Sequence, residues 1–486
     1  MKLNLKSPTV PTRENRLGSV TGYVGDLQDL VNQSRCGSLK NSERCFSQSS
    51  TCLSGCAMGI ASIRDIAVVY HAPAGCVSFT NVLGNQLARN IGATYDTNVV
   101  STDMSEDDTV FGALDSAKSL VYKAFEQYHP KAIALLASCV GGVIGEDIDS
   151  ITDELQEELG IPVFPMHCEG FKSRIWASGF DVADHAVLRH LVKPPREKRR
   201  VVNFKNFFES ERKYITELFA RLDVTPQFLY SNSTVEDIAH LSEALCTTCI
   251  CGTLGTYLGN GLEEEYAVPY IRTINPMGMA GFDAWFRAIG KAVDREEAAE
   301  RVIAEHREQY LGEILKIKEE IQGHTAIIGM GPGYTYEIAR VCQELGIEVV
   351  WAAAWHYDYK YDNGDIPPAL DYLQNNSPCN IGLSVADQQN FEVMNILNEY
   401  KPDLYFSRHP GSTVWAIKQG VTAVFVADEY MVFGYRGTLS FAKSVRDALK
   451  NRSFEKNLAA RIKLPYTDWW YRQRNDVMFK KDKVEA

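Results

Sequence analysis

The sequence predicts an α/β protein built from three Rossmann-like domains, in which helices flank parallel sheets. Nearly continuous apolar runs alternate with helical patterns, which is typical of strands buried on both faces of a parallel sheet. The chain has 486 residues, and at roughly 150 residues per domain this length corresponds to about three domains. Ligands of such sheets bind beyond the carboxyl ends of the strands, so we expect the functional residues there.

The first clear unit lies between residues 131 and 168. The segment "KAIALLASC" predicts a strand, and "VGGVIGEDIDSITDELQEELG" predicts a loop followed by a helix with acidic residues at helical spacing. The apolar segment "IPVFPMHC" then predicts the next strand.

The same pattern returns twice near the C-terminus. "HTAIIGMGPG", "YTYEIARVCQELG" and "IEVVWAAAW" predict strand, helix and strand over 324–355. "KPDLYFSRHPG", "STVWAIKQG" and "VTAVFVADE" predict another such unit over 401–429.

Two charged segments predict the domain boundaries. Residues 195–206, "PREKRRVVNFKN", are basic and contain proline, and residues 295–324 form a long amphipathic helical pattern that ends at glycine. We therefore expect domains at 1–198, 199–323 and 324–486. The tail after 465 contains two adjacent tryptophans, which either contact a partner or fold back on their own domain.

Composition excludes some classes of protein. Asp and Glu outnumber Lys and Arg by 62 to 50, and this acidic balance disfavours nucleic acid as the main ligand. No apolar run reaches the roughly 18 residues of a membrane span. The N-terminus has no apolar core of the signal-peptide type, so we expect a cytoplasmic protein.

Twelve cysteines are unusual in a large chain from a reducing compartment. Cys56, Cys76 and Cys139 lie in glycine-rich loops or at the ends of predicted strands. Thiolates are the usual ligands of iron–sulfur clusters, and small neighbours let a bulky inorganic body approach. The spacing fits no zinc pattern, and buried structural cysteine remains the alternative for each.

Two further loops are candidate binding elements. In "CTTCIC", residues 246–251, a single functional thiolate is favoured, because the second half of a zinc ribbon is missing. In "GMGPG", Gly329, Gly331 and Gly333 predict a tight turn whose amides face an anionic ligand. Tyr334 replaces the third glycine of the dinucleotide fingerprint, which disfavours NAD(P).

Several segments together resemble the alpha-type subunit of the nitrogenase superfamily over nearly the whole chain. They are "IRDIAVVYHAPAGC", "STDMSEDDTVFGALDSAKSLVYKAFEQYHPKAI", "SCVGGVIGEDIDSI", "PMHCEGFKSRIWASGFDVADHAV" and "CGTLGTYLGNGLEEEYAVPYI". The resemblance implies a heterotetramer of two alpha and two beta subunits. It also implies a P-cluster-like interface iron–sulfur cluster, a large buried iron–sulfur cofactor, and a separate ATP-dependent iron–sulfur reductase.

The resemblance also implies ligands. Cys56, Cys76 and Cys139 match the interface-cluster cysteines, and Cys251 matches the thiolate of the large cofactor, with Cys249 as the alternative. The clusters are expected between the domains. Electrons would come from the reductase, through the interface cluster, to the cofactor.

At other positions that contact the cofactor in the family, this chain carries different residues. The histidine that holds the far end of the nitrogenase cofactor falls on Ala427, unless the register slips to Asp428. Polar groups that contact the cofactor fall on Trp176 and Phe180.

The remaining departures lie near the C-terminus. The arginine near the cofactor loop falls on Tyr334, and the lysine near the organic acid falls near His409 and Pro410. Because dinitrogen reduction needs many positioned proton donors, these changes argue against nitrogen fixation as the main task.

An apolar, aromatic pocket favours a thioether substrate. The chain therefore resembles most the methylthio-alkane reductase branch, which converts dimethyl sulfide or 2-methylthioethanol to methanethiol and a hydrocarbon. Expected catalytic residues are Trp176, Phe180, Tyr334 and His409. The alternatives are an iron-only or vanadium-type nitrogenase subunit and a scaffold for cofactor assembly. Candidate proton sources are His71, His167, His356 and His409, each of which is otherwise a structural histidine.

Overall fold

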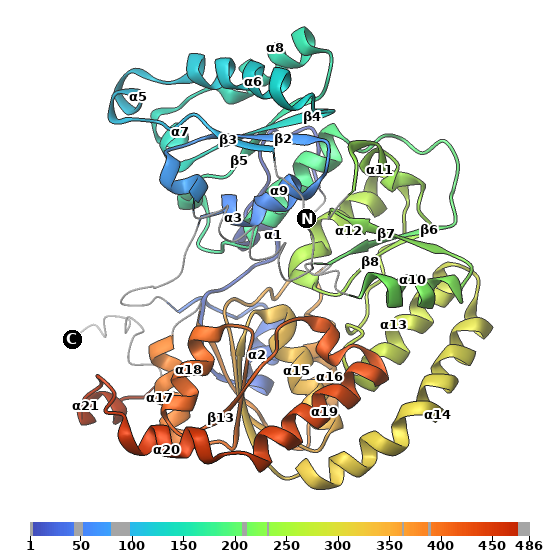
Figure 1. The fold of residues 1–486 in the computed structure, drawn as a ribbon, viewed down its shortest axis with the longest axis vertical. Helices are drawn as coiled ribbons and strands as arrows, with labels where there is room; N and C mark the ends of the chain where they lie inside the picture. Colours follow the sequence, from blue (N-terminus) through green and yellow to red (C-terminus); the bar gives the residue numbers. More distant parts are fainter. Residues whose placement is uncertain are drawn as a thin grey trace. The chain divides into compact units, whose positions relative to one another are not determined.

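The computed structural model describes residues 3–42, 52–78, 98–206, 211–230, 233–361, 364–386 and 390–474. The chain divides into two compact units (Figure 1). Unit 1 comprises residues 1–13, 50–271 and 292–295, and unit 2 comprises the rest. Among the helices described, none combines the length and apolar character needed to span a membrane.

Unit 1 contains two parallel sheets. The four-stranded sheet has the order β3-β2-β4-β5, and the three-stranded sheet has the order β7-β6-β8. The strands are β2 (Ile66–His71), β3 (Asn98–Ser101), β4 (Ala132–Ala137), β5 (Val163–His167), β6 (Val201–Lys205), β7 (Thr225–Leu229) and β8 (Cys246–Cys249). The helices are α3 (Ser54–Ala57), α5 (Glu106–Phe111), α6 (Leu114–Tyr128), α7 (Cys139–Ile144), α8 (Ile148–Leu159), α9 (Ser178–His190), α10 (Arg212–Ala220), α11 (Val235–Ala239) and α12 (Gly252–Tyr266), with 3-10 turns at Met58–Ser62, Gly170–Lys172 and Leu241–Glu243.

Both faces of the four-stranded sheet are covered, which explains its unbroken apolar strands. Alternate residues of a strand point to opposite faces. Ala67 and Val69 of β2 pack with α6 and α8, whereas Val68 and Tyr70 pack with residues of α9. Every residue of β2 and of β4 is accordingly buried.

Unit 2 contains a six-stranded sheet with the order β1-β11-β10-β9-β12-β13. Its strands are β1 (Gly22–Asp26), β9 (Thr325–Met330), β10 (Glu348–Ala354), β11 (Gly382–Ala386), β12 (Leu404–Ser407) and β13 (Thr422–Phe425). Its helices are α2 (Leu27–Arg35), α13 (Gly278–Ala292), α14 (Glu296–Ile321), α15 (Pro332–Glu344), α16 (Pro368–Asn376), α17 (Asn390–Tyr400), α18 (Pro410–Lys418), α19 (Gly434–Lys450), α20 (Ser453–Arg461) and α21 (Asp468–Tyr471), with a 3-10 turn at Glu429–Val432; α1 (Arg13–Arg16) spans the limit between the units.

The predicted α/β class and its parallel sheets are confirmed. One edge differs, because β1 pairs with β11 antiparallel. The segment "GYVGD" is short and holds two glycines, so its apolar pattern carries no strand signal. The expected long helix at 295–324 is α14, and the basic segment 195–206 contains β6. The domain limits near 198 and 323 stay predictions.

Candidate functional site

Cysteines follow three neighbouring strands of the four-stranded sheet. The last residues of β2, β4 and β5 are aligned in register. Cys168 directly follows the last residue of β5, and Cys139 comes just after β4. Cys76 follows β2 after a short loop. Together with Cys52, we call these cysteines the thiol edge. The carboxyl ends of parallel strands are where ligands of such sheets bind.

Electrostatic coupling shows that the four thiols lie near one another. Burial raises the pKa of Cys76, and the charges of Cys52 and Cys139 raise it further. Burial also raises the pKa of Cys168 well above its usual value, with added contributions from Glu169, Cys52 and Cys139. A thiol of this kind becomes a thiolate when a metal centre supplies positive charge.

Cys52 is a further cysteine close to this edge. Its Sγ lies 2.8 Å from Ser54 Oγ, and its charge acts on Cys76 and Cys168. The predicted ligand Cys56 has its backbone in α3, but its side chain lies outside the described residues. The choice between the two cysteines of "CLSGC" therefore stays a prediction.

Cys139 is the exposed member of the thiol edge. The backbone N–H of Gly170 donates a hydrogen bond to Cys139 Sγ at 3.1 Å, and such bonds tune the potential of iron–sulfur clusters. Exposed apolar side chains lie on the neighbouring elements α5, α7 and the turn at 170–172; they are Val110, Phe111, Val143 and Phe171. In the described ranges, no three His, Cys, Asp or Glu side chains are placed to hold one metal ion.

Two histidines end the strands beside these thiols. His71 Nε2 pairs with Glu146 Oε2 at 2.5 Å, and His167 Nε2 pairs with Asp149 Oδ2 at 2.9 Å. Burial lowers the pKa of His167, but the hydrogen bonds and charges of Asp149 and Glu169 outweigh it and raise the pKa to about 9. His167 is therefore charged at neutral pH.

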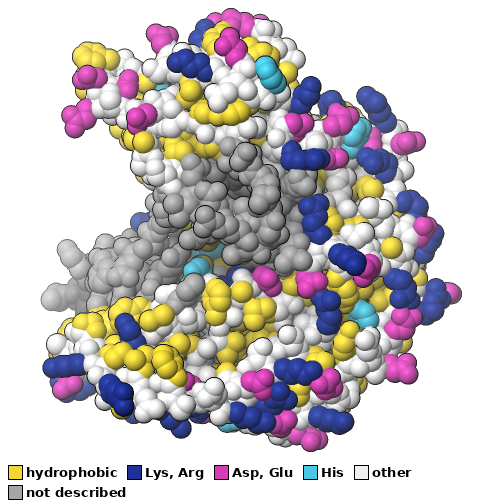
Figure 2. All heavy atoms as spheres, viewed as in Figure 1, with side chains coloured by type: hydrophobic (Ala, Val, Ile, Leu, Met, Phe, Trp, Pro, Cys, Tyr) yellow, Lys and Arg dark blue, Asp and Glu magenta, His cyan; other side chains and the backbone are white. Residues whose placement is uncertain are grey.

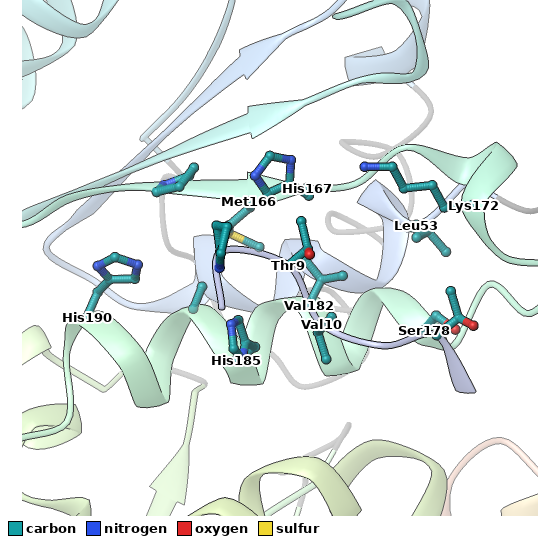
Figure 3. Close-up of a pocket in the computed structure, with 14 residues that line it drawn as sticks. Thr9, Val10, Leu53, Met166, His167, Lys172, Ser178, Val182, His185 and His190 are labelled. Atoms are coloured by element: carbon teal, nitrogen blue, oxygen red, sulfur yellow. The ribbon is translucent and has the colours of Figure 1, made fainter. Parts of the chain in front are cut away.

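A cavity of about 40 Å³ lies between β5, α9 and the N-terminal segment 8–12 (Figure 3). This volume is large enough for water. It is lined by His167, His185 and His190 together with Leu53, the neighbour of Cys52. Burial, with the charges of Arg189 and His185, lowers the pKa of His190 to about 4, so this imidazole is neutral.

The predicted cofactor thiol, Cys251, is buried at the N-terminus of α12. Cys249 Sγ donates a hydrogen bond to the carbonyl oxygen of Cys251 at 2.9 Å. A Cβ at Gly255 would come within 2.4 Å of Cys249 Sγ, so the helix turn after Cys251 encloses the Cys249 sulfur. Cys249 therefore supports the loop, and the assignment of Cys251 as the ligand stays a prediction.

Trp176 and Phe180 are one helical turn apart at the start of α9, with their rings 5.7 Å apart in an edge-to-face arrangement. The indole Nε1 of Trp176 is buried and has no hydrogen-bond partner among the described residues. Buried polar atoms normally find a partner, so this donor is unusual among the described residues.

In unit 2, aromatic side chains and the guanidinium of Arg408 lie at the carboxyl ends of the central strands. Gly331 follows β9 and begins α15, and its neighbour Tyr334 is buried. The guanidinium of Arg408, after β12, lies 3.9 Å from the centre of the Tyr334 ring. His409 contacts Trp355, which follows β10, with ring centres 4.0 Å apart.

Other predicted positions in unit 2 lie in β9, in the first turn of α15 or after the strands, and their functional roles stay predictions. Gly329 lies within β9, where a Cβ would come within 2.3 Å of Tyr405 Oη, and Gly333 lies in the first turn of α15. Burial, aided by the charge of Arg408, lowers the pKa of His409 to about 4. The other expected histidine, His356, is buried.

The family position at Ala427 is exposed, and a methyl side chain cannot bind a metal. Its neighbour Asp428 uses Oδ1 to accept hydrogen bonds from the backbone N–H groups of Tyr430 and Met431, at 2.9 and 3.2 Å. This carboxylate caps the following 3-10 turn, which is a structural role.

The described part of the tail folds back on unit 2. Tyr466 contacts Trp415 and Trp470, with ring centres 6.2 and 6.0 Å apart. Trp469 nevertheless stays 58% exposed, and Figure 2 shows hydrophobic side chains gathered near α18.

Comparison with known proteins identifies two kinds of relative. The nitrogenase molybdenum-iron protein alpha chain of Methanosarcina barkeri is 28% identical over 323 residues, which cover 63% of this chain and 60% of that protein. The nitrogenase iron-molybdenum cofactor biosynthesis protein NifE of Methanococcus maripaludis is 27% identical over 417 residues, covering 83% and 84%.

The solved structure titled "Nitrogenase Cp1 at pH 6.5" has the same fold. Its TM-score is 0.68 at 20% identity, and the alignment covers 88% of this chain and 94% of that one. Residues 51–450 match the family described as "Nitrogenase component 1 type Oxidoreductase". The chain therefore belongs to the nitrogenase component 1 family of oxidoreductases.

Proposed function

We propose that this chain is the catalytic alpha-type subunit of a nitrogenase-like, ATP-dependent reductase that cleaves the C–S bond of methylthio-alkanes. The observation that carries the proposal is the unpartnered indole N–H of Trp176 beside the ring of Phe180. A thioether sulfur is a weak hydrogen-bond acceptor that also contacts aromatic rings favourably. This pair of rings therefore suits such a sulfur better than a strongly polar substrate.

The cysteines fit the two iron–sulfur groups that the family implies. Cys76 and Cys139, with Cys52 or Cys56, would hold the interface cluster, and Cys251 would hold the large cofactor. The Gly170 N–H already donates to Cys139 Sγ, and such bonds tune the potential of a bound cluster. When bound, the large cofactor would supply the electrons for C–S cleavage.

The chain's own residues would bind and enclose the substrate. Trp176 and Phe180 would contact the methylthio group and exclude water from it. In unit 2, Arg408 lies over the ring of Tyr334, so a cation stands beside the position of the family's lost arginine.

Exposed apolar side chains support the expected partners. Val143 lies one helical turn after Cys139 on α7, and Phe171 follows Gly170. Phe111 is 85% exposed. Large exposed apolar groups around a thiol of this kind favour a beta-type subunit, and in turn the reductase, covering this edge.

A scaffold for cofactor assembly is the second candidate. It is favoured by the long match to a cofactor biosynthesis protein and by Ala427, which offers no second ligand. An iron-only or vanadium-type nitrogenase is the third reading of the same cysteines.

Purification without oxygen, together with the beta-type subunit, the reductase and ATP, separates these readings. Dimethyl sulfide should yield methane and methanethiol, and 2-methylthioethanol should yield ethylene, methanethiol and water, each with two electrons and two protons. Gas chromatography of the headspace detects these products. Ammonia from dinitrogen would instead indicate a nitrogenase. Transfer of a cluster to another apoprotein without any product would indicate the scaffold.

A further inference from the structure

A buried charged cluster lies at the carboxyl edge of the three-stranded sheet. Lys205 is the last residue of the central strand β6 and stands opposite Cys249 of β8 in register. Asp184 comes from α9, and Tyr230 directly follows β7. Lys205, Asp184 and Tyr230 are 1%, 0% and 6% exposed, which is rare for charged side chains.

The three side chains contact one another directly. Lys205 Nζ forms an ion pair with Asp184 Oδ1, and Tyr230 Oη donates a hydrogen bond to the same oxygen at 2.5 Å. Lys205 Nζ also lies 4.8 Å from the centre of the Tyr230 ring. The second oxygen of Asp184, Oδ2, is buried without a hydrogen-bond partner in the described part of the chain.

This cluster lies beside the loop that carries the candidate cofactor thiol, because Lys205 of β6 is the register partner of Cys249 of β8. Cys249 in turn donates to the carbonyl of Cys251. Asp184 lies one helical turn after Phe180, so both occupy the same face of α9.

An enclosed reductive site needs a source of protons. Each electron that enters a region of low dielectric adds a charge that is costly unless a proton follows. Phe180 has no proton to give, and an indole N–H does not ionise in this range. The ammonium group of Lys205 is buried, and its residue pairs in register with Cys249 on the loop side of β8. The buried Arg13 also contacts this loop, at the carbonyl of Thr253, but a guanidinium does not release a proton near neutral pH.

We propose that Lys205 is the internal proton donor of the enclosed region beside Cys251, with Asp184 and Tyr230 as the residues that position it. This inference rests on the proposed function and names the donor for that reaction. An N–H bond of the ammonium breaks, its electron pair stays on the amine, and the proton goes to the carbon or sulfur released by C–S cleavage. The electrons come from the iron–sulfur reductase, and solvent returns one proton to the amine before the next turnover.

The groups around Lys205 fit this role. Asp184 faces it from α9, Tyr230 from the end of β7 and Cys249 from β8. Burial raises the pKa of Asp184, and the charge of Asp181 adds to this rise, while Lys205 and Tyr230 oppose it. Asp181 is itself neutralised by Arg13, at 2.8 Å.

The decisive test replaces Lys205 by arginine in the whole complex with its reductase. Arginine keeps the positive charge and the ion pair but does not release a proton near neutral pH. We expect Lys205→Arg to bind its clusters normally, as judged by electron paramagnetic resonance, and to lose roughly a hundredfold in hydrocarbon formation. The matched control Lys198→Arg, at a lysine bonded to the carbonyls of Ser242 and Ala244, should keep the wild-type rate.

Retention of the rate in Lys205→Arg within about twofold would overturn the proposal. If the larger arginine prevents folding, the double variant Lys205→Met with Asp184→Asn replaces it in the test. This variant removes both charges of the buried ion pair, so neither is left unpaired. The same roughly hundredfold loss with normal clusters supports a proton donor. An unchanged rate overturns it.

Infrared spectroscopy of the complex without substrate gives a readout that does not depend on turnover. With Lys205→Met, we expect Asp184 to take up a proton and show a carboxylic acid band, which Asp184→Asn removes. The absence of that band would contradict proton exchange within the cluster. A wild-type complex that shows normal clusters but forms no hydrocarbon would refute the proposed function, while the infrared comparison still tests the cluster itself.

Discussion

The carboxyl edges of the four-stranded sheet in unit 1 and the six-stranded sheet in unit 2 are built alike and carry different chemistry. In unit 1, Cys76, Cys139 and Cys168 follow the strands, beside histidines paired with carboxylates. In unit 2, Gly331, Trp355 and the pair Arg408–His409 follow the corresponding strands.

The difference teaches that the residue after each strand sets the chemistry of an edge, because parallel strands bring whatever follows them to one place. Thiolates are the usual ligands of iron–sulfur clusters. Aromatic rings and a guanidinium instead offer apolar surface and positive charge.

The largest effect is expected at the thiol edge. Cys139→Ala should abolish the interface-cluster signal and the electron transfer that depends on it, because a thiolate ligand is lost. Iron and sulfide content, together with electron paramagnetic resonance of the complex, measure this. The control Cys342→Ala removes a fully buried cysteine of unit 2 and should cost only about 1 kcal/mol of stability without loss of iron. Equal iron loss in both variants would contradict the prediction that the cysteines of the unit 1 edge bind the cluster and Cys342 does not.

Cys52 and Cys56 are the alternative third ligands at the same edge. The charge of Cys52 acts on Cys76 and Cys168, whereas the family resemblance favours Cys56. We therefore expect one of the variants Cys52→Ser and Cys56→Ser to lose interface-cluster iron and the other to keep it, and iron analysis of the complex identifies the ligand. Unchanged iron in both variants would contradict a third ligand in this segment.

The free energy of unfolding should change with pH in opposite directions at His167 in unit 1 and at His409 in unit 2. His167 is stabilising when it is protonated. Its pKa is raised from 6.5 to about 9, so its stabilisation is complete below pH 6.5 and is lost as the pH rises through about 9. The shift corresponds to about 3 kcal/mol. His167→Gln should therefore lower the unfolding temperature at neutral pH and not above about pH 10. The exposed His129→Gln is the control, and an equal effect at both pH values would contradict the prediction.

At His409 the sign is reversed. Its pKa is lowered from 6.5 to about 4, so the folded state favours the neutral ring and loses stability as the pH falls from 6.5 towards 4. The loss is about 3 kcal/mol. His409→Gln should remove this acid sensitivity in thermal unfolding measured across that range. Unchanged acid sensitivity would mean that other groups cause it.

The smallest effect concerns the ring beneath Arg408. Tyr334→Leu removes the aromatic face 3.9 Å from the guanidinium and should cost about 1 kcal/mol. Tyr334→Phe keeps that face and should cost less. Denaturant unfolding of both variants measures the difference, and equal losses would show that the hydroxyl rather than the ring matters.

Much of the fold was predictable because its strands are buried on both faces. The runs at 131–139 and 324–333 became β4 and β9, and the charged stretch 295–324 became α14. The edge strand β1 was not predicted, since it pairs with β11 far along the chain and has no apolar run of its own.

The candidate site was predictable only where a single loop carries it. The cysteines after the strands were found because each stands beside small residues in a loop. Arg408 and the pair Lys205–Asp184 were missed, because each matters only through a residue from another element. In the sequence, Lys205 at the end of its strand cannot be distinguished from an exposed lysine, because its partner Asp184 lies on a different element, α9.

The amino-acid sequence by itself determined the α/β class, the strand–helix–strand units at 131–168, 324–355 and 401–429, and which loops carry thiols. Local patterns suffice for these features, because burial of a strand or helix face depends on nearby residues. Only the tertiary structure decided which thiols lie together and that Lys205 meets Asp184. Those contacts join residues far apart in the chain, and their energy depends on distances of a few ångströms that no local pattern encodes.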